Sequence, residues 1–526
     1  SMMSSSRPST VAGDEEVPTP VPSLTYLRPQ VSKLHCRLVT FINECVIPAE
    51  HEYHQHMSNQ VDRWSIDAIP PCLPKLQQQA QHLGLWNLFI PPRLANHLPQ
   101  SYLDWYQSIS NNSNNNNSNN NNNGQHIFLT YREYGILAEQ MGRSELGAMA
   151  CNCSAPDTGN MEVLLEFGTH EQQLTYLVPL LKGEIRSTFL MTEPNVASSD
   201  PTNLSTTLTK CYDNNNNKNN KGHNNGHGHN VSYILNGRKW WSTGAMDPRC
   251  RVGICVARIV DNMDIHNNPS STHVRNNNTR SSNSNNNKHG QHTIVIVPIP
   301  SQGFQTIRPL TVFGYDDAPF GHAEVALDNI QLTHHHLVGG EGSGFQVSQA
   351  RLGPGRIHHC MRAVGMAQRC YDLMLQRSTE RKTFGKFLWE HGSLQRDIAN
   401  SFADLHQARL LTLHCAHMMD TAVGGPKQAR QFISSIKVAV PKLCMDVIDR
   451  ALQVFGGAGV SDDYVIANAW ASMRTLRIAD GPDEVHRRSV ALKEIKQLQK
   501  QQQQQQQQHG QQKSEHSDLR PYTSRL

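Results

Sequence analysis

Three carboxylates lie close together in the stretch RIADGPDEVHRR, residues 477–488. They are Asp480, Asp483 and Glu484, and a Gly-Pro pair separates the first from the other two. A carboxylate can remove a proton from a substrate when its surroundings tune its pKa, but most clusters of charged residues are solvated surface. The spacing permits both a charged surface turn and a general base, so the other motifs must decide between them.

Two stretches in the middle of the chain have the features of ligand-binding strand ends. In FLMTEPNVASSD, 189–200, a predicted strand ends at Thr192 and a Glu-Pro turn follows, which frees backbone groups and the Thr192 hydroxyl to face a heteroaromatic ring. In GRKWWSTGA, 237–245, the adjacent Trp240 and Trp241 are expected on opposite faces of a strand, so that one packs and the other covers a cofactor. A capped turn and an aromatic packing pair are the structural alternatives.

Two later stretches could hold phosphates or approach a ligand with their backbone. In ERKTFGK, 380–386, the planar guanidinium of Arg381 offers a fork that suits a pyrophosphate; a surface ion pair is the alternative. In QVFGGAGV, 453–460, Gly456 and Gly457 either allow a ligand close to the backbone or end a helix.

Other candidate motifs lack the context that their chemistry needs. The stretch GGEGSGF, 339–345, is not followed by Lys-Ser/Thr and lies in no βαβ unit, so it is predicted to connect a strand to a helix. The three histidines at 334–336 favour a solvated linker over a metal site. The twelve cysteines lack paired spacing, which predicts no metal site and indicates a reducing compartment.

Composition excludes several classes of function. The net charge of +4 suits a small anionic ligand, but no basic run is interleaved with aromatic residues, so we expect no nucleic-acid binding. No stretch of about 18 apolar residues occurs, so we expect no membrane-spanning helix. The first residues carry acids and no apolar region, so we expect neither a signal nor a transit peptide.

Hydrophobic periodicity divides the chain into three parts. Residues 25–185 are predicted to be helical, residues 186–335 to form a β-domain of short strands, and residues 336–498 to be helical again. Within the last part a helix over 431–455 carries Pro441 as a kink. Polar tails and low-complexity tracts cannot bury apolar area, and we expect disorder at 1–24, 108–124, 210–230, 261–292 and 499–526.

In their order and context the four motifs resemble the signature segments of the acyl-CoA dehydrogenase family. The resemblance covers roughly residues 30–498 and is closest to the branch whose animal members can carry an appended phosphotransferase-like domain, which we do not expect in this sequence. It implies an α+β multidomain fold with an N-terminal all-α domain, a central β-barrel or sandwich and a C-terminal four-helix bundle. It also implies FAD as the cofactor, an acyl-CoA substrate, and a homodimer or homotetramer.

The resemblance assigns cofactor contacts to positions in all four motifs. Flavin-ring contacts fall on Phe189, Met191, Thr192, Trp241, Ser242 and Thr243. Ser198 is implied to contact both flavin and acyl-CoA, and Arg381 with Phe384 to reach FAD across a subunit interface. Adenine-side contacts fall on Gln453, Gly456 and Gly457.

The resemblance also selects the base. Family members place it at one of two positions: one is Gly355 here, which carries no acid, and the other is Asp480. Most relatives have Glu at this place, and Asp is one methylene shorter, so its reach depends on the backbone or the substrate. Arg356 is expected to hold Asp480 ionised through charge pairing.

Further substrate and flavin contacts flank these residues. Gly353, Pro354 and Gly355, with Arg356, are expected to border the acyl chain or pantetheine, and Gly481 is the backbone neighbour of a bound thioester. The flavin-side contacts after the base are expected at Pro482, Asp483 and Glu484.

The predicted reaction is FAD-dependent α,β-dehydrogenation of an acyl-CoA to the trans-2-enoyl-CoA, with electron-transfer flavoprotein or oxygen as acceptor. The alternatives are an acyl-CoA oxidase, a nitroalkane-oxidase-like oxidation of a carbon acid and, from another class, a catalytically silent flavoprotein scaffold. The tripeptide Ser524-Arg525-Leu526 differs from the peroxisomal S-K-L address by one Lys→Arg change. It predicts recognition by the peroxisomal import receptor, with a mitochondrial or cytoplasmic location as the alternative.

Overall fold

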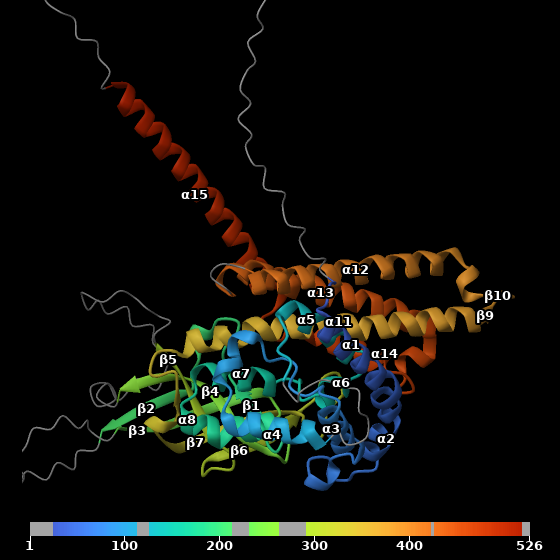
Figure 1. Cartoon of the computed structure of the whole chain (residues 1–526), viewed down its shortest axis with the longest axis horizontal. Helices are drawn as coiled ribbons and strands as arrows, with labels where there is room; N and C mark the ends of the chain where they lie inside the picture. The colour runs from blue at the N-terminus through green and yellow to red at the C-terminus, as the bar shows by residue number, and fades with distance from the viewer. Residues whose placement is uncertain (1–24, 113–125, 213–230, 262–290, 422–425, 518–526) are drawn as a thin grey trace, which may run out of the picture.

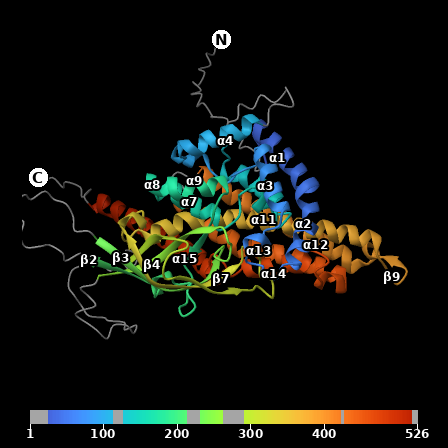
Figure 2. The same cartoon turned by 90° about the horizontal axis from the view of Figure 1, so that it is seen from below.

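The computed structural model describes residues 25–112, 126–212, 231–261, 291–421 and 426–517. In this part of the chain helices come first, a β-sheet follows and long helices come last, in the predicted order. Figure 1 shows the sheet beneath one end of the long helices. In Figure 2 the N-terminal helices lie on one side of α11 and the sheet lies on the other. Most of the predicted disordered tracts at 1–24, 108–124, 210–230 and 261–292 lies outside the described residues, as does Ser524–Leu526.

The N-terminal part is helical because its apolar residues recur at helical spacing. Val31, Leu34, Leu38 and Phe41 form the buried stripe of the first helix. The elements are α1 Pro29–Phe41, η1 Ile42–Val46, α2 Ile47–Ser58, η2 Ile66–Ala68, α3 Cys72–His82, η3 Pro92–His97, α4 Gln100–Asn112, α5 Tyr131–Met141, α6 Gly147–Ala150, α7 Asp157–Phe167, α8 His170–Gln172, η5 Gln173–Leu177 and α9 Val178–Lys182.

The middle part forms one mixed sheet. Its elements are β1 Arg186–Leu190, η6 Pro201–Asn203, β2 Thr207–Tyr212, β3 Val231–Thr243, β4 Cys250–Asp261, β5 His292–Pro298, β6 Phe304–Leu310, β7 His322–Thr333, η8 His334–His336 and β8 Leu337–Val338. The strand order is β6-β7-β3-β2-β4-β5-β8. The predicted insertions join β2 to β3 and β4 to β5, which are antiparallel neighbours, as expected for hairpin connections.

The sheet corrects one detail of the expected β-barrel or sandwich. Both β1 and β2 pair in parallel with β4, β1 along its first half and β2 along its last residues. β4 is therefore a branch point, and β6 and the two-residue β8 end the path, so that the described strands form an open sheet and no closed barrel.

Both faces of the sheet are buried. On β4, Val252, Ile254 and Val256 join the core of the N-terminal helices, whereas Cys255 and Ala257 join a separate core on the other face. This alternation follows from the period of two along a strand. The helices α7 and α11 pack against the first face, at β1 and β5, and thereby bring the C-terminal bundle to the ends of the strands.

The last part is a bundle of long helices with a common apolar core. Its elements are α11 Gly344–Glu380, β9 Lys382–Thr383, β10 Lys386–Phe387, η9 Leu388–Glu390, α12 Gly392–Thr421, α13 Pro426–Phe455, η10 Gly456–Val460, α14 Ile466–Leu476 and α15 Asp483–Ser517. Pro441 lies inside α13, and the helix ends at Gly456 as predicted.

The Gln-rich segment differs from the expected disordered tail. α15 continues through it to Ser517 and extends away from the body of the molecule (Figure 1). Gln is a good helix former, and the first turns of α15 are packed against α13, so the helix has an anchored start from which to continue.

Candidate active site

The turn after β1 is built around a buried ion pair. Lys239 of β3 donates to Glu193 at 2.8 Å and to the carbonyl oxygens of Met191 and Val256, and both charged side chains are almost fully buried. Burial alone would raise the pKa of Glu193, but the Lys239 charge and several hydrogen bonds lower it to about 2. The Glu193 amide donates to the Ser198 hydroxyl at 3.1 Å. Glu193 therefore fixes the turn that carries Met191 and Ser198.

The two strand-end motifs meet at this turn. The Trp240 amide donates to the Thr192 carbonyl at 3.0 Å. A bulge in β3 between Lys239 and Ser242 breaks the expected alternation of faces, and Trp241 adopts a φ of +52°. As a result Trp241 is 39% exposed while Trp240 is half-buried. The more accessible indole is the one predicted to meet the flavin.

Polar atoms of these motifs fit a hydrogen-bonding ligand. The Ser242 hydroxyl and the Trp240 indole nitrogen are buried and have no hydrogen-bond partner among the described residues. Because buried polar groups in proteins are nearly always bonded, a ligand with polar ring edges, such as a flavin, would satisfy them. Thr243 already has a partner, since its hydroxyl lies 2.9 Å from Nδ1 of His322.

Arg351 of α11 links the sheet to the acidic loop, the turn that carries Asp480, Asp483 and Glu484. Its guanidinium lies 3.8 Å from the centre of the Phe189 ring, and its Nε donates to Asn160 at 3.1 Å. Its charge also lowers the pKa of Asp480. Phe189, the predicted flavin contact, and Asp480, the predicted base, therefore flank one cation.

Asp480 lies in the turn between α14 and α15 in a left-handed conformation, with φ +55°. Its carbonyl oxygen lies 3.1 Å from Nε of Arg356 and 3.1 Å from Nε2 of His486. Its carboxylate oxygen Oδ2 lies 3.6 Å from Nε2 of His359, and the side chain is 25% exposed. Arg356 therefore bonds to the backbone of the loop, and its positive charge lowers the pKa of the Asp480 carboxylate.

Basic groups surround the Asp480 carboxylate. Burial raises the pKa of Asp480, but the neighbouring His359 and the positive charges of Arg351, Lys437 and Arg356 outweigh burial and hold the pKa below its usual value. Burial and neighbouring cations lower the pKa of His359 to about 3, so this ring is neutral at neutral pH. The lasting charges are therefore those of the two arginines and Lys437, and they keep Asp480 ionised.

Lys437 is a site residue that the motifs did not indicate. It is fully buried in α13 and donates to the carbonyl oxygens of Leu476 and Ala479, at 2.6 and 2.8 Å. The sequence signal was a lysine in the apolar run of this helix, between Ile436 and Val440. Burial of a lone lysine is rare unless the site needs its charge or its donors.

The other two acids of RIADGPDEVHRR have different surroundings. Asp483 begins α15, is buried, and accepts hydrogen bonds from Arg477 at 2.8 and 2.9 Å. Glu484 is 78% exposed and pairs with Arg487. Asp483 anchors the helix start, and the predicted flavin-side contacts of Pro482, Asp483 and Glu484 stay predictions.

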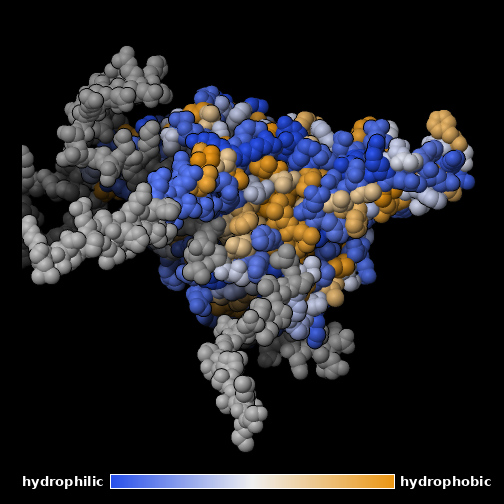
Figure 3. All heavy atoms as spheres, turned by 90° about the horizontal axis from the view of Figure 1, so that it is seen from above, coloured by the Kyte–Doolittle hydropathy of each residue, from blue (hydrophilic) through white to orange (hydrophobic). Residues whose placement is uncertain are grey.

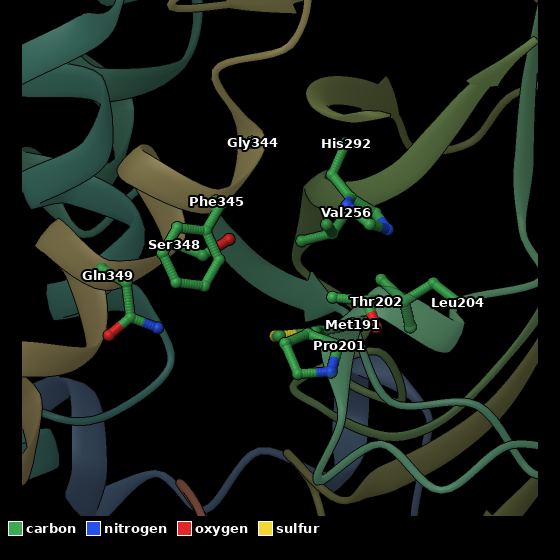
Figure 4. A pocket seen from close by; sticks show the side chains of 10 residues that line it. All are labelled: Met191, Pro201, Thr202, Leu204, Val256, His292, Gly344, Phe345, Ser348 and Gln349. Atoms are coloured by element: carbon green, nitrogen blue, oxygen red, sulfur yellow. The ribbon is translucent and has the colours of Figure 1, made fainter. Parts of the chain in front are cut away.

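A cleft separates the first turns of α11 from the sheet (Figure 4). Gly344, Phe345, Ser348 and Gln349 line it from α11, and Met191, Pro201, Thr202, Leu204, Val256 and His292 line it from the other side. Of these residues the motifs indicated Met191. Further along α11 a Cβ added to Gly355 would meet nothing within 4 Å, and one added to Gly353 only Ile433 at 3.9 Å. The backbone of α11 therefore leaves space at Gly355, and the predicted substrate contacts of Gly353, Pro354, Gly355 and Arg356 stay predictions.

The remaining predicted cofactor residues gather at the far end of the bundle. Arg381 and Phe384 belong to the β9–β10 hairpin at the opposite end of α11 from the sheet (Figures 1 and 2). The Phe455 ring lies 5.3 Å from the Arg377 guanidinium, which brings the end of α13, with Gln453, Gly456 and Gly457, to the same end. Phe384 is 98% exposed, and Figure 3 shows an apolar tip there. Within a single chain, these residues therefore lie far from the residues predicted to contact the flavin ring.

No described helix combines the length and apolar character that crossing a membrane requires. The described residues contain no group of three or more His, Cys, Asp or Glu side chains arranged to hold a metal ion.

Comparisons with known proteins agree with the motifs. The family described as "Acyl-CoA dehydrogenase, C-terminal domain" matches residues 342–494. The chain is 40% identical over 467 residues to the candidate acyl-CoA dehydrogenase IBR3 of Arabidopsis thaliana, covering 89% of this chain and 50% of that protein. It is 39% identical to the candidate acyl-CoA dehydrogenase FadE2 of Mycobacterium tuberculosis, covering 87% of this chain and 94% of that protein.

A solved structure of a candidate acyl-CoA dehydrogenase from Mycobacterium abscessus superposes with a TM-score of 0.71 at 35% identity, covering 90% of this chain and all of that one. This chain belongs to the acyl-CoA dehydrogenase family, whose members are FAD-dependent oxidoreductases. It spans about half the length of several curated relatives that it matches, IBR3 among them.

Proposed function

We propose that the chain catalyses FAD-dependent α,β-dehydrogenation of an acyl-CoA thioester to the trans-2-enoyl-CoA. Asp480 takes the α-proton of the substrate on its carboxylate. When bound, FAD supplies the redox chemistry by accepting the β-hydrogen with its electron pair. The observation that carries this proposal is a partly exposed Asp480 carboxylate whose pKa neighbouring cations hold low, so that it is ionised and accessible at neutral pH.

The flavin ring would be held by the two strand-end motifs. Buried Ser242 and the accessible indole of Trp241 offer a hydrogen bond and a stacking surface, and Thr192 is tied to the same strand through the Trp240 amide. Arg351 beside Phe189 extends this region towards Asp480. The strand ends therefore suit a planar ring with polar edges, and the Asp480 side suits a substrate that loses a proton from carbon.

The adenine and pyrophosphate side would be completed by a second copy of the chain. Arg381, Phe384 and the Gly456–Gly457 pair lie at the bundle end remote from the flavin-ring candidates, and Phe384 is almost wholly exposed. A homodimer or homotetramer in which one chain's hairpin reaches the other's FAD accounts for this separation. Ultracentrifugation of wild type and an Arg381→Ala variant, with FAD content measured, tests this part of the proposal.

The reaction is tested by anaerobic bleaching of the flavin. Purified protein is mixed with acyl-CoAs that differ in chain length, branching and 4-hydroxylation, and flavin absorbance is followed. We expect at least one thioester to bleach wild type, and Asp480→Asn to slow bleaching by about 1000-fold. Asp463→Asn, on the exposed turn before α14, is the matched control and keeps the wild-type rate. If no thioester bleaches the flavin, or if Asp480→Asn reacts as fast as wild type, the proposal fails.

The electron acceptor and the location need separate tests. Peroxide formed in air at one equivalent per enoyl-CoA would assign the chain to the oxidase alternative, whereas turnover that needs electron-transfer flavoprotein supports the dehydrogenase. We keep a peroxisomal location as part of the proposal because of Ser524-Arg525-Leu526. The address acts only at a free C-terminus, so a fluorescent protein ending in the last twelve or so residues should enter peroxisomes, and one without the tripeptide should not.

A further inference from the structure

A chain of contacts leads from the protein interior to the Asp480 carboxylate. Arg362 of α11 donates from Nη1 to the Cys153 carbonyl at 3.1 Å, and its Nη2 lies 3.2 Å from Nδ1 of His359, one helical turn before it. The other ring nitrogen of His359, Nε2, lies 3.6 Å from Oδ2 of Asp480. His359 is thus held between a fixed cation and the proposed base.

The arginine decides which ring nitrogen carries the proton. A guanidinium has only donors, so Nδ1 of His359 must be the acceptor of that hydrogen bond. The ring hydrogen of the neutral imidazole is therefore on Nε2, the nitrogen nearest to Asp480. Burial and the Arg362 charge lower the pKa of His359 to about 3, so the ring stays neutral while Asp480 is ionised. His359 faces the carboxylate as a neutral donor of fixed tautomer.

The backbone of Asp480 is held separately from its side chain. Nε of Arg356 donates to the Asp480 carbonyl, and Nε2 of His486 lies 3.1 Å from the same oxygen. Neither carboxylate oxygen of Asp480 accepts a hydrogen bond from the described residues, and Asp480 and His359 keep 25% and 30% of their side-chain surfaces exposed. Oδ2 faces His359, and the partly exposed carboxylate keeps the capacity to meet a substrate.

We propose that His359 is a positioning residue for the base: its neutral Nε2–H orients the Asp480 carboxylate through Oδ2 and leaves Oδ1 to take the substrate proton, and Arg362 fixes the tautomer that makes this possible. The inference rests on the proposed role of Asp480. An aspartate arm is short, so a rotation of the carboxylate away from the substrate would cost more reach than it would for glutamate. Misplacement by about 1 Å costs roughly 100-fold in rate.

His359 differs in kind from the other groups around Asp480. Arg351 and Arg356 from α11 and Lys437 from α13 act as fixed cations, and His486 from α15 contacts the backbone. These groups remain when His359 is replaced. A His359 variant therefore tests the orienting contact between the imidazole and the carboxylate, while the electrostatic support of the ionised carboxylate stays in place.

The test compares two neighbouring histidines on α11. In His359→Phe, which keeps the ring volume but not the donor, we expect flavin reduction by the best acyl-CoA to slow about 10- to 100-fold. The Kd for that acyl-CoA should stay within about twofold, and the acidic limb of the rate profile should move to higher pH. His359→Gln, which keeps an N–H donor, should recover most of the rate. His358→Phe is the matched control, because the His358 ring packs against Tyr134 and its nitrogens have no hydrogen-bond partner among the described residues. This variant should leave the rate and the acidic limb of the profile unchanged.

A second measurement does not depend on activity. With histidine ring nitrogens labelled with ¹⁵N, the His359 signal, assigned by its loss in His359→Phe, should show the neutral Nε2–H tautomer from about pH 5 to 8. A Nδ1–H or charged ring overturns the inference. So does a His359→Phe variant with wild-type rate and limb, or an equal loss in both Phe variants without rescue by Gln. If instead Asp480→Asn keeps the wild-type rate, the proposed function itself fails, whatever the tautomer.

Discussion

Two fully buried lysines serve this protein in different ways. Lys239 lies in the sheet and contacts the Glu193 carboxylate directly, at 2.8 Å. Lys437 lies in the bundle and donates to two backbone carbonyls, while Asp480 feels its charge without a hydrogen bond from it. The first arrangement fixes a carboxylate within a closed network. The second fixes the loop that carries a carboxylate and leaves the carboxylate itself accessible.

The difference separates stability from reactivity. A carboxylate that accepts several strong hydrogen bonds is a good structural element, but it has little capacity left to take up a proton. Glu193 is of this kind, and it shapes the turn that carries the flavin-side residues. Asp480 is kept ionised mainly by charges that do not occupy its oxygens.

The largest effect is expected from Lys239→Met. It would leave Glu193 buried without its counter-charge, and breaking a buried ion pair typically lowers the free energy of unfolding by about 3–5 kcal/mol. Urea denaturation monitored by circular dichroism measures this. The double variant Lys239→Met with Glu193→Gln is the control and should recover part of the loss, because it removes the unpaired charge. A single variant as stable as wild type would show that the pair does not hold the turn.

A smaller effect, on the reaction, is expected from Lys437→Met. Without this lysine the carbonyls of Leu476 and Ala479 lose their donor and the Asp480 loop can shift, so flavin reduction should slow by about 10- to 100-fold. The pKa of Asp480 should rise, which moves the acidic limb of the rate to higher pH. Stopped-flow reduction across pH measures both. A Lys442→Met variant, on the exposed side of the same helix, should show neither change.

Glu162 is a third buried acid, and its pKa is shifted in the opposite direction to that of Glu193. Glu162 has no hydrogen-bond partner among the described residues, and burial raises its pKa to about 8, whereas that of Glu193 falls to about 2. The stability from Glu193 is present above the unfolded-state pKa of about 4.3 and is lost as the pH falls towards 2. The stability linked to Glu162 is present below about 4.3 and is lost as the pH rises towards 8.

Glu162→Gln should therefore be close to neutral at pH 4 and stabilise the protein by about 2 kcal/mol at pH 6 relative to wild type. Denaturation midpoints at the two pH values measure the difference. An effect of Glu162→Gln that is the same at both pH values would mean that this carboxyl is ionised in the folded protein.

The smallest effect is expected at the rim of the acidic loop. Arg487 is 53% exposed, and its contacts with Asp483 and Glu484 are 3.4 and 3.1 Å. Exposed pairs contribute about 0–1 kcal/mol, so Arg487→Ala should change the free energy of unfolding by less than about 1 kcal/mol. Arg477→Ala, which removes the closer partner of buried Asp483, should cost more in the same denaturation assay. Equal costs would contradict the distinction between the two arginines.

The sequence was sufficient to predict features that depend on local patterns and short motifs. Short β-branched segments predicted the main strands, and the four motifs predicted the family and Asp480. It did not predict β6 or β8, because β6 is largely exposed and contains Pro309 and β8 has only two residues. It also missed β2, which lies directly before an Asn-rich tract. Nor did it predict the branch at β4, since strand partners depend on contacts distant in sequence.

The missed site residues have a similar explanation. His359 and Arg351 lie on a long helix where a polar residue gives no sign of which neighbour it will face. Lys437 gave a usable signal, a cation inside an apolar stripe, but only the fold shows that the Asp480 loop supplies its partners. Arg356 was expected to act on Asp480 through its charge, and its hydrogen bond to the Asp480 carbonyl is a further contact that the motifs did not indicate.

The left-handed turn at Asp480 bears on which acid can serve there. Asp480 has φ +55° and Gly481 φ +100°, and a Cβ at Gly481 would lie 2.7 Å from the His486 ring. Aspartate tolerates the left-handed region better than most longer side chains, because its short polar group can bond locally. The length of the acid and the shape of the loop are therefore one linked choice. A glutamate at position 480 would gain one methylene of reach but would place a longer side chain at a φ that it adopts less readily.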